Sequence, residues 1–396
     1  MRPHTLTARW LFPVSGPPLP NGTIAIQNGT ILAVEPHGIR TADEDLGNVA
    51  IVPGLVNAHI HLDLSGARGL VPPTSCEHFT DWLRGVIAYR SQCTTTEADI
   101  RASIRECQRY GTTLVGDIAA NGQSWAALAN APLRAVVFWE AIGISQSRAD
   151  QAHEAFRHWL DAIVPTANCR PGVSPHAPYS VRASSYERLA KFALPMATHL
   201  AETRGEIDLI ERRTGPFVRF LQQLGITDPD ALTNSIASIV DALPAAIFAH
   251  GNYLPDAISL SRQQSMAYCP RTHAAFGHSP YPLRRYLDRG FRIALGTDSL
   301  ASNPDLDVLA EARFAKQCHP DVSGAEILRM ATLAGAESLG FANVGGSLEA
   351  GKSADLVIVP LPKNDDEPYE LLLGELAIRS ERRTMFAGQW RVSEFW

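Results

Sequence analysis

Short apolar runs rich in β-branched residues alternate with stretches of helical spacing through the middle of the chain. We predict eight strands, near residues 55–62, 112–118, 134–142, 169–175, 195–200, 246–251, 265–269 and 292–297. Helices are predicted between them, for example at 97–110 and 184–192. Eight strand–helix units in this order predict a parallel (β/α)₈ barrel of the TIM type, with a doubly wound open sheet as the alternative.

Both ends of the chain have a different pattern. Residues 23–34 form two β-rich runs around Asn28-Gly29, which is the strongest short signal for a hairpin. Near the other end, residues 351–359 predict a turn followed by a strand, and residues 385–392 predict a strand, a turn and a strand. We therefore predict a small β-sandwich domain built from both termini (1–52 and 345–396) around a barrel domain at 53–344.

Composition narrows the class of protein. The 396 residues exceed a plain barrel of about 250 residues, which leaves room for the β domain and long loops. A chain that is 45% apolar and 19% charged is neither disordered nor collagen-like. The net charge of −6, without blocks of like charge, argues against a nucleic-acid partner. The six cysteines include no C-x-x-C pair, and no run of 18 apolar residues occurs, so we expect no membrane partner and a cytoplasmic location.

Histidines and acids gather where the predicted strands end. His59 and His61 close the first strand and, being two positions apart, lie on the same face of it. The residues that follow later strands are His176, His199, Glu202, His250 and Asp298. In a closed barrel the carboxyl ends of the strands meet on one face, where barrel active sites lie. Imidazoles and a carboxylate that meet there would suit one divalent metal ion: Zn²⁺, with Fe²⁺ or Mn²⁺ as alternatives.

Several segments together resemble the amidohydrolase superfamily, in its cytosine-deaminase-like and chlorohydrolase-like branch. They are PGLVNAHIH (53–61), HLAET (199–203), CPR (269–271), LGTD (295–298), SN (302–303) and GKSADL (351–356), in family order. The resemblance implies a metal-dependent hydrolase that acts on non-peptide carbon–nitrogen bonds, and it names the metal ligands: His59, His61, His199 and Asp298.

The resemblance also implies roles in catalysis. Glu202 would carry a proton from the attacking water to a ring nitrogen of the substrate, and His250 would hydrogen-bond and polarise that water. Asp298 would accept a proton during the attack. His176 matches a histidine that contacts substrate in the adenine-nucleoside deaminases of this branch.

The lysines decide the expected number of metal ions. The chain has only four lysines, and Lys191 is the one between His61 and His199. Members of the superfamily with two metals bridge them with a carboxylated lysine on the fourth strand. Lys191 lies well past that strand, in a predicted helix, so we predict one metal ion.

Three further residues are candidate substrate contacts. Asp81 lies in a segment that, by the resemblance, forms a loop covering the substrate, and its carboxylate would bind ribose hydroxyls. An exposed acid at the start of a helix is the alternative. Glu140 ends the third strand and points to the face of the site. His273 follows the seventh strand, in a loop that either contacts substrate or is simply well packed.

We therefore expect a mononuclear aminohydrolase that releases ammonia from an N-heterocycle, with a small molecule as its partner. The expected substrates are adenine nucleosides modified at the 5′ position, of the S-adenosylhomocysteine, methylthioadenosine, 5′-deoxyadenosine or aminodeoxyfutalosine type. The run 61–65 (HLDLS) is similar to H-L-E-F-S of aminofutalosine deaminases, with Asp63 and Leu64 as departures. The alternatives are a chlorohydrolase, a cyclic-amide hydrolase of the imidazolonepropionase type, and a non-catalytic barrel. The resemblance is compatible with a homodimer.

Overall fold

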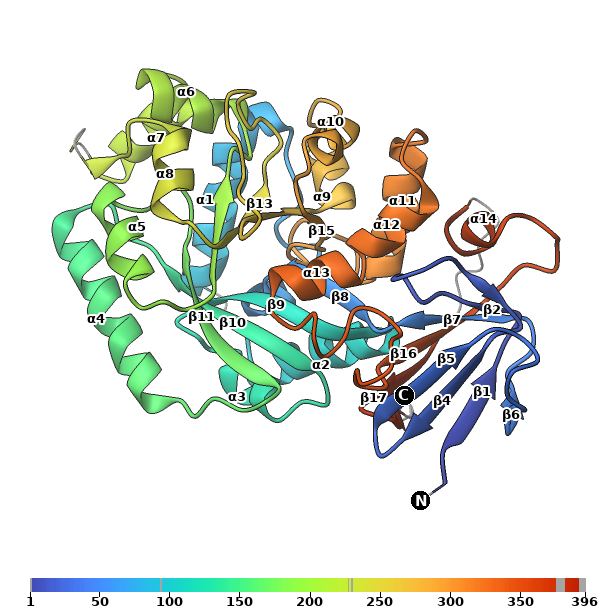
Figure 1. Ribbon diagram of the computed structural model, residues 1–396. Coiled ribbons are helices and arrows are strands. Elements are labelled where there is room, and N and C mark those ends of the chain that lie inside the picture. Colours follow the sequence, from blue (N-terminus) through green and yellow to red (C-terminus); the bar gives the residue numbers. More distant parts are fainter. Residues whose placement is uncertain (1, 93–94, 227, 229–230, 375–381, 392–396) are drawn as a thin grey trace.

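The central element of the computed structural model is an eight-stranded parallel sheet whose strands neighbour one another in chain order (Figure 1). The structure describes residues 2–92, 95–226, 228, 231–374 and 382–391. The strands of this sheet are β8 (Leu55–Ile60), β9 (Thr112–Ala120), β10 (Arg134–Ala141), β11 (Cys169–Pro175), β12 (Met196–Leu200), β13 (Ala246–His250), β14 (Ser265–Tyr268) and β15 (Ile293–Leu295). All eight predicted strands are present, with ends within two residues of the prediction.

The sheet closes into a barrel between its first and last strands. The backbone N–H groups of Thr297 and Asp298 both donate to the carbonyl oxygen of His59, at 3.1 and 3.0 Å. A parallel bridge pairs Ile60 with Asp298. The barrel prediction is confirmed, and the alternative of an open doubly wound sheet is wrong.

Apolar side chains from strands around the barrel meet in one buried cluster. It includes Val56 and Ala58 of β8, Phe138 of β10 and Ile247 of β13. Strands on different sides of a closed barrel can share a cluster only in its interior, so the interior is a packed core. This core supports the side chains at the carboxyl ends of the strands.

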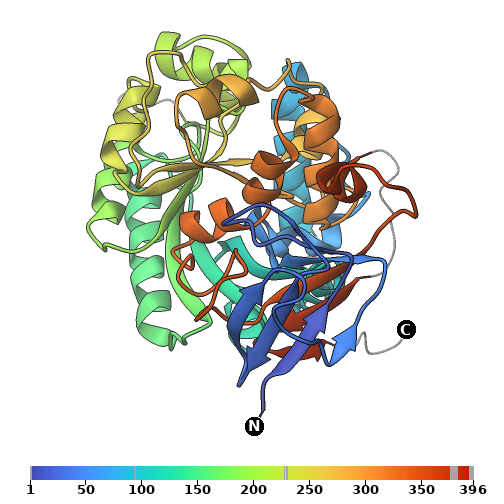
Figure 2. The ribbon, with the colours of Figure 1, turned by 45° about the vertical axis from the view of Figure 1, so that its right-hand side comes forward.

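Helices connect the strands and surround the sheet (Figures 1 and 2). Those before β13 are α1 (Phe79–Gln92), α2 (Glu97–Arg109), α3 (Trp125–Ala129), α4 (Gln146–Ala162), α5 (Ala183–Ala190), α6 (Arg204–Arg212), α7 (Pro216–Gln223) and α8 (Ile236–Ala242). Those after it are α9 (Pro270–Ala275), α10 (Leu283–Asp288), α11 (Val308–Cys318), α12 (Gly324–Met330), α13 (Leu333–Ser338) and α14 (Pro368–Leu373). Two short 3₁₀ helices, η1 (Leu62–Ala67) and η2 (Cys76–His78), lie between β8 and α1.

Helix boundaries follow local capping signals. Thr96 and Asp99 form a capping box at the start of α2, in which each side chain accepts the backbone N–H of the other residue. The predicted helices at 97–110 and 184–192 correspond to α2 and α5. None of the helices in the described ranges has both the length and the apolar character needed to cross a membrane.

Two further sheets form a separate domain from both ends of the chain. One has the order β5-β4-β1-β6 and the other the order β18-β17-β16-β7-β2-β3. Their strands are β1 (His4–Thr7), β2 (Trp10–Leu11), β3 (Leu19–Pro20), β4 (Thr23–Gln27), β5 (Thr30–Glu35), β6 (Glu44–Asp45), β7 (Val49–Pro53), β16 (Leu356–Pro360), β17 (Arg383–Phe386) and β18 (Gln389–Arg391). Figure 2 shows both sheets on the same side of the barrel.

The two sheets pack together around side chains such as Leu6, Ile24, Ile51 and Leu356. The predicted hairpin is present, because Asn28 and Gly29 both have positive φ (51° and 78°), as a two-residue type I′ turn requires. The predicted sandwich built from both termini is confirmed. The boundaries at 52/53 and 344/345 stay a prediction.

Candidate metal centre and active site

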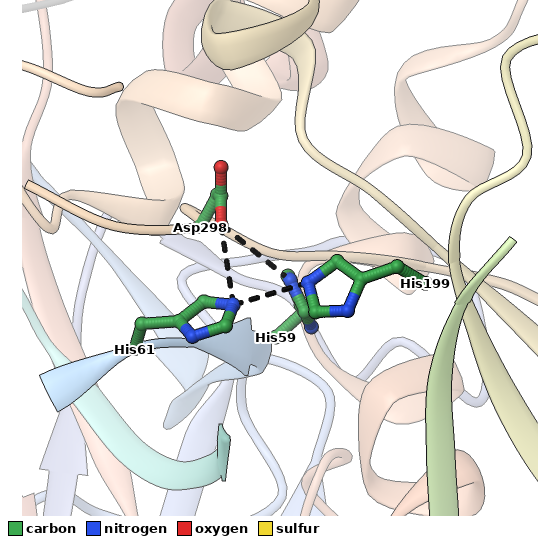
Figure 3. A group of neighbouring side chains, drawn as sticks. All are labelled: His59, His61, His199 and Asp298. Carbon is green, nitrogen blue, oxygen red and sulfur yellow. Dashed lines mark hydrogen bonds and ion pairs between the residues drawn. The ribbon is translucent and has the colours of Figure 1, made fainter. Parts of the chain in front are cut away.

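Four side chains from distant parts of the sequence meet at the carboxyl end of the barrel (Figure 3). His59 and His61 come from the end of β8, His199 from β12, and Asp298 from the turn after β15. One possible ligand atom of each residue lies within 4.8 Å of the others, and all four residues are buried. The four residues predicted as metal ligands therefore lie together.

The spacing inside this group is that of side chains directed at a common point. The Nε2 atoms of His61 and His199 are 3.1 Å apart. The Oδ1 atom of Asp298 lies 3.6 Å from Nε2 of His59 and 3.6 Å from Nε2 of His61. Asp298 has a positive φ of 58°, a conformation that costs a non-glycine residue about 1 kcal/mol and often occurs at functional sites.

The protonation of His199 fits a cation at that point. Nδ1 of His199 lies 2.9 Å from the carbonyl oxygen of His176, which can only accept, so Nδ1 carries the proton and Nε2 presents its lone pair. Burial, followed by the neighbouring imidazoles, holds the pKa of His199 well below its ordinary value. Neither ring nitrogen of His59 has a hydrogen-bond partner among the described residues. A buried imidazole lone pair that faces two other imidazoles and a carboxylate suits a divalent metal ion.

The carboxylate of the group is ionised. Burial acts to raise the pKa of Asp298, but the imidazoles of His59, His250 and His61 outweigh it, and the pKa is held below its ordinary value. Ser302 Oγ donates to the Oδ2 atom of Asp298 at 2.7 Å. One oxygen is thereby fixed and the other faces the three histidines.

Glu202 and His250 lie beside this group and contact each other. Nε2 of His250 is 3.4 Å from Oε1 of Glu202. Burial, with the charges of Asp298 and Glu206, raises the pKa of Glu202 well above its ordinary value. Burial lowers the pKa of His250 to about 3, against the opposing charge of Asp298. Burial therefore favours the neutral form of both groups, and they lie where they can exchange protons with a ligand.

The backbone around Glu202 is held by a second carboxylate. The N–H groups of Ala201 and Glu202 donate to the side chain of Glu206 at 2.7 and 2.9 Å. Asn252 Nδ2 donates to the carbonyl oxygen of Glu202 at 3.0 Å. Glu206 lies in the first turn of α6 and is fully buried. The sequence shows only an acid at a helix start, so its role was not predicted.

A small cavity opens above the four-residue group. Its apolar wall comes from one face of α1, with Phe79, Trp82, Leu83 and Val86 at helical spacing. Its polar lining includes Glu140, His176, Tyr179 and Glu202. A pocket with one apolar wall and a few converging polar groups suits a flat, partly apolar small molecule.

The predicted substrate contacts divide into two pairs. Glu140 and His176 line this cavity. Asp81 does not: its carboxylate is exposed and pairs with Arg84 at 2.7 Å. The ring nitrogens of His273 face Asn252 Oδ1 at 3.0 Å and the carbonyl of Ser279 at 2.9 Å, and His273 does not line the cavity either. The segment around Asp81 is the first turn of α1, and Asp81 is an exposed acid at this helix start; its contact with substrate stays a prediction.

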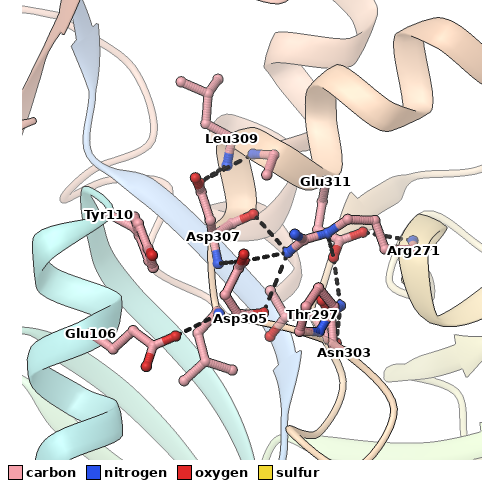
Figure 4. A network of polar contacts seen from close by, with 12 residues as sticks. Glu106, Tyr110, Arg271, Thr297, Asn303, Asp305, Asp307, Leu309 and Glu311 are labelled. Atoms are coloured by element: carbon pink, nitrogen blue, oxygen red, sulfur yellow. Dashed lines mark hydrogen bonds and ion pairs between the residues drawn. The ribbon is translucent and has the colours of Figure 1, made fainter. Parts of the chain in front are cut away.

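A polar network behind the site holds the residue before Asp298 (Figure 4). The guanidinium of Arg271 donates to Glu311 and to Asp305, both at 2.7 Å. Asn303 Nδ2 donates to Glu311 at 2.6 Å and to the carbonyl oxygen of Thr297 at 2.7 Å. Arg271 and Asn303 belong to the motifs CPR and SN, which the sequence analysis identified. Their partner Glu311 looks in the sequence like any acid on a helix, so its place in the network could not be predicted.

Comparisons with known proteins agree with this arrangement. The chain is 30% identical over 388 residues to the 5-methylthioadenosine/S-adenosylhomocysteine deaminase of Moorella thermoacetica, covering 90% of this chain and 87% of the relative. It is 28% identical over 346 residues to the aminodeoxyfutalosine deaminase of Nitratiruptor sp., covering 82% of each. The crystal structure of Helicobacter pylori aminofutalosine deaminase in complex with methylthio-coformycin has the same fold, with a TM-score of 0.86 at 21% identity over 98% of this chain and 100% of that chain.

The match to a family extends over nearly the whole chain. The sequence profile described as the Amidohydrolase family covers residues 50–391, which include the barrel and part of the terminal domain. The matched region contains every residue of the group in Figure 3. The chain therefore belongs to the amidohydrolase family and is a hydrolase of that family.

Proposed function

We propose that this protein is an aminohydrolase with one divalent metal ion, Zn²⁺, that hydrolytically deaminates a 5′-modified adenine nucleoside and releases ammonia. The observation that carries the proposal is the buried pair of Glu202 and His250, 3.4 Å apart, beside three histidines and an aspartate. A carboxyl that can take up and release a proton next to a metal group is what the replacement of an amine by an oxygen requires, because the ring and the leaving amine both need protons.

His59, His61, His199 and Asp298 would hold the metal ion, which lowers the pKa of a bound water toward neutrality and so supplies a nucleophile. Fe²⁺ and Mn²⁺ also suit this ligand set. The proposal of one ion is supported by the position of Lys191, which is exposed and directly follows α5, not on β11. The described part of β11 contains no lysine.

The chain's own residues would move two protons. Glu202 passes one proton of the attacking water to a ring nitrogen of the substrate, and its raised pKa lets the carboxyl hold that proton between the two transfers. His250, as a neutral imidazole, accepts a hydrogen bond from the same water and orients it. Asp298 takes the second proton and delivers it to the amine. The carbon–nitrogen bond then breaks, and the products are a keto heterocycle and ammonia.

The substrate class is supported by the relatives and by the pocket. Two relatives are named for deamination of nucleosides of this class. The apolar wall of α1 suits the face of a purine, while Glu140 and His176 offer hydrogen bonds at its edge. The cytoplasmic location and the homodimer stay predictions.

An ammonia-release assay tests the proposal. Zinc-loaded protein is incubated with S-adenosylhomocysteine, methylthioadenosine, 5′-deoxyadenosine and aminodeoxyfutalosine. We expect ammonia and the keto product in equal amounts from at least one of them. Chloride release from a chlorotriazine, or ring opening of a cyclic amide without ammonia, would favour the alternative hydrolases. No ammonia from any of these nucleosides, with one metal ion bound per chain, would rule out the adenine substrate.

A further inference from the structure

Arg90, in the last turn of α1, links two buried carboxylates at the edge of the cavity. Its guanidinium donates to Oδ2 of Asp63 at 2.5 Å and to Oε2 of Glu140 at 3.0 Å. The side chains of Asp63 and Glu140 are each 1% exposed, and that of Arg90 is 27% exposed. The mechanism proposed above assigns no role to Arg90 or to Asp63.

The second oxygen of each carboxylate faces an imidazole. Oδ1 of Asp63 lies 3.7 Å from Nδ1 of His61, whose other nitrogen faces the metal group. Oε1 of Glu140 lies 3.8 Å from Nε2 of His176, whose Nδ1 contacts Ser180 Oγ at 2.6 Å. Neither carboxylate oxygen has a hydrogen-bond partner among the described residues. Each carboxylate is therefore held by Arg90 on one side and directed at an imidazole on the other.

We propose that Arg90 is a positioning residue that fixes the ring of His61 through Asp63 and the ring of His176 through Glu140. The proposal rests on the metal centre of the proposed function. A histidine that binds a metal usually donates its other ring N–H to a carboxylate, which sets its tautomer and orientation. Here that carboxylate comes from the 3₁₀ turn directly after β8 and is itself held by α1.

Arginine suits this position better than lysine. Its planar fork has several N–H groups in fixed directions, so one side chain can hold two carboxylates at once. A lysine supplies one charged nitrogen on a flexible stem and would hold the two acids less firmly. Because α1 also forms the apolar wall of the cavity, the same contact joins the substrate pocket to the metal group.

Metal affinity, measured by competition with a chelator, tests the chain of contacts from Arg90 through Asp63 to His61, and it needs no substrate. Loss of a group that orients a metal ligand commonly costs about 10–100-fold in metal affinity. We expect Arg90→Met and Asp63→Asn each to raise the dissociation constant for Zn²⁺ by about tenfold or more. The double variant should bind no more weakly than the weaker of the two, because both changes break one chain of contacts. Arg90→Lys should lie between Arg90→Met and the wild type.

Two matched variants separate positioning from general damage. Arg84→Met removes a half-buried arginine of the same helix that contacts neither Asp63 nor Glu140 in the described structure, and it should leave Zn²⁺ affinity within twofold of the wild type. Glu140→Gln weakens the contact between Arg90 and residue 140. It should also leave Zn²⁺ affinity within twofold of the wild type, while raising KM for the nucleoside. A merely structural role would lower the unfolding temperature of Arg90→Met without the non-additive metal effect.

Three outcomes would overturn the proposal. One is a folded Arg90→Met variant with wild-type Zn²⁺ affinity. Another is a double variant whose increase in the Zn²⁺ dissociation constant equals the product of the increases for Arg90→Met and Asp63→Asn. If Arg90→Met does not fold, the same cycle with Arg90→Lys and Asp63→Asn decides by the same criteria. Wild-type protein that binds no metal would overturn the proposed function as well, whereas tight binding unaffected by Arg90 overturns this inference alone.

Discussion

Glu202 is the residue on which the proposed chemistry depends most. Its carboxyl is buried, contacts His250 and faces the cavity. We predict that Glu202→Gln lowers kcat by about 10²–10⁴-fold, because an amide of nearly the same shape cannot carry a proton. Metal content, measured by atomic emission, should stay at the wild-type level. A Glu202→Gln enzyme with more than a tenth of wild-type kcat would contradict the role of proton carrier.

Glu206 gives a prediction about pH and stability. Burial raises its pKa to about 7 from an ordinary value of 4.5, although the hydrogen bonds that it accepts from backbone N–H groups act to lower the pKa. A carboxyl whose pKa is raised in the folded state stabilises the protein fully below pH 4.5, and this contribution is lost as the pH rises through 7. The Glu206→Gln variant has no carboxyl at this position and so does not lose this stability as the pH rises. The free energy of unfolding of the variant, relative to that of the wild type, should therefore rise by about 3 kcal/mol between pH 4.5 and pH 8.

Urea unfolding of both proteins at several pH values measures this difference. Glu211→Gln, an exposed acid of the same helix, serves as the control. A Glu206→Gln difference that does not change with pH would show that the carboxyl of Glu206 has its ordinary pKa.

Residues at strand ends could be predicted from the sequence, and the residues that support them could not. His59, His199 and Asp298 each follow a recognisable strand, and barrel closure alone brings such positions together. Glu206 and Glu311 lie on helices, where an acid is ordinarily solvated, and their burial depends on how each helix packs. The carboxylate of Asp81 is exposed and pairs with Arg84, and its predicted contact with substrate stays a prediction.

At the scale of elements, α1 shapes the pocket through a single face. Phe79, Trp82, Leu83 and Val86 point into the cavity, and the indole N–H of Trp82 donates to the carbonyl oxygen of Val71 at 3.2 Å. We predict that Trp82→Ala raises KM for the nucleoside at least tenfold and changes kcat by less than about threefold, because a wall binds the substrate and the transition state alike.

Steady-state kinetics measure this effect, and Ile87→Ala is the control. Ile87 is on the same helix and 47% exposed, so its loss should leave both constants unchanged. A Trp82→Ala enzyme with wild-type KM would show that α1 does not contact the substrate.

The strands were easier to predict than α1 for a physical reason. Most barrel strands are short, largely apolar runs that are buried on both faces, a pattern visible without knowing their neighbours. The apolar face of α1 has helical spacing, but besides packing in the main buried cluster it lines a cavity, which the sequence pattern does not reveal. Only the resemblance pointed to this segment as a cover, and the structure shows that the cover is a helix.

At the scale of the whole molecule, the terminal domain is tied to the barrel by buried ion pairs. Arg382, just before β17, bonds both oxygens of Asp307 at 2.6 and 2.7 Å. Asp307 caps the start of α11 by accepting the N–H groups of Leu309 and Ala310. Arg134 at the start of β10 pairs with Asp355 of the terminal domain. The contact between Arg382 and Asp307 positions the start of α11, which also carries Glu311 of the network behind the site.

Removal of Arg382 should therefore destabilise the protein more than it affects catalysis. The side chain is 2% exposed, and breaking one partner of a buried pair costs about 3–5 kcal/mol. We predict that Arg382→Met lowers the unfolding temperature by several degrees in a calorimetric scan. Arg383→Met removes the adjacent arginine, which is 54% exposed, and should have little effect. Equal unfolding temperatures for the two variants would contradict a tie between the domains at Arg382.

The central claim is that this protein hydrolytically deaminates a 5′-modified adenine nucleoside. Ammonia release by the zinc-loaded protein tests this claim most directly. The account predicts that a 5′-modified adenine nucleoside yields one ammonia per keto product, and that His199→Ala, which lacks one ligand of the group, yields none. Wild-type protein that holds one metal ion per chain and releases no ammonia from any of the four nucleosides would contradict it.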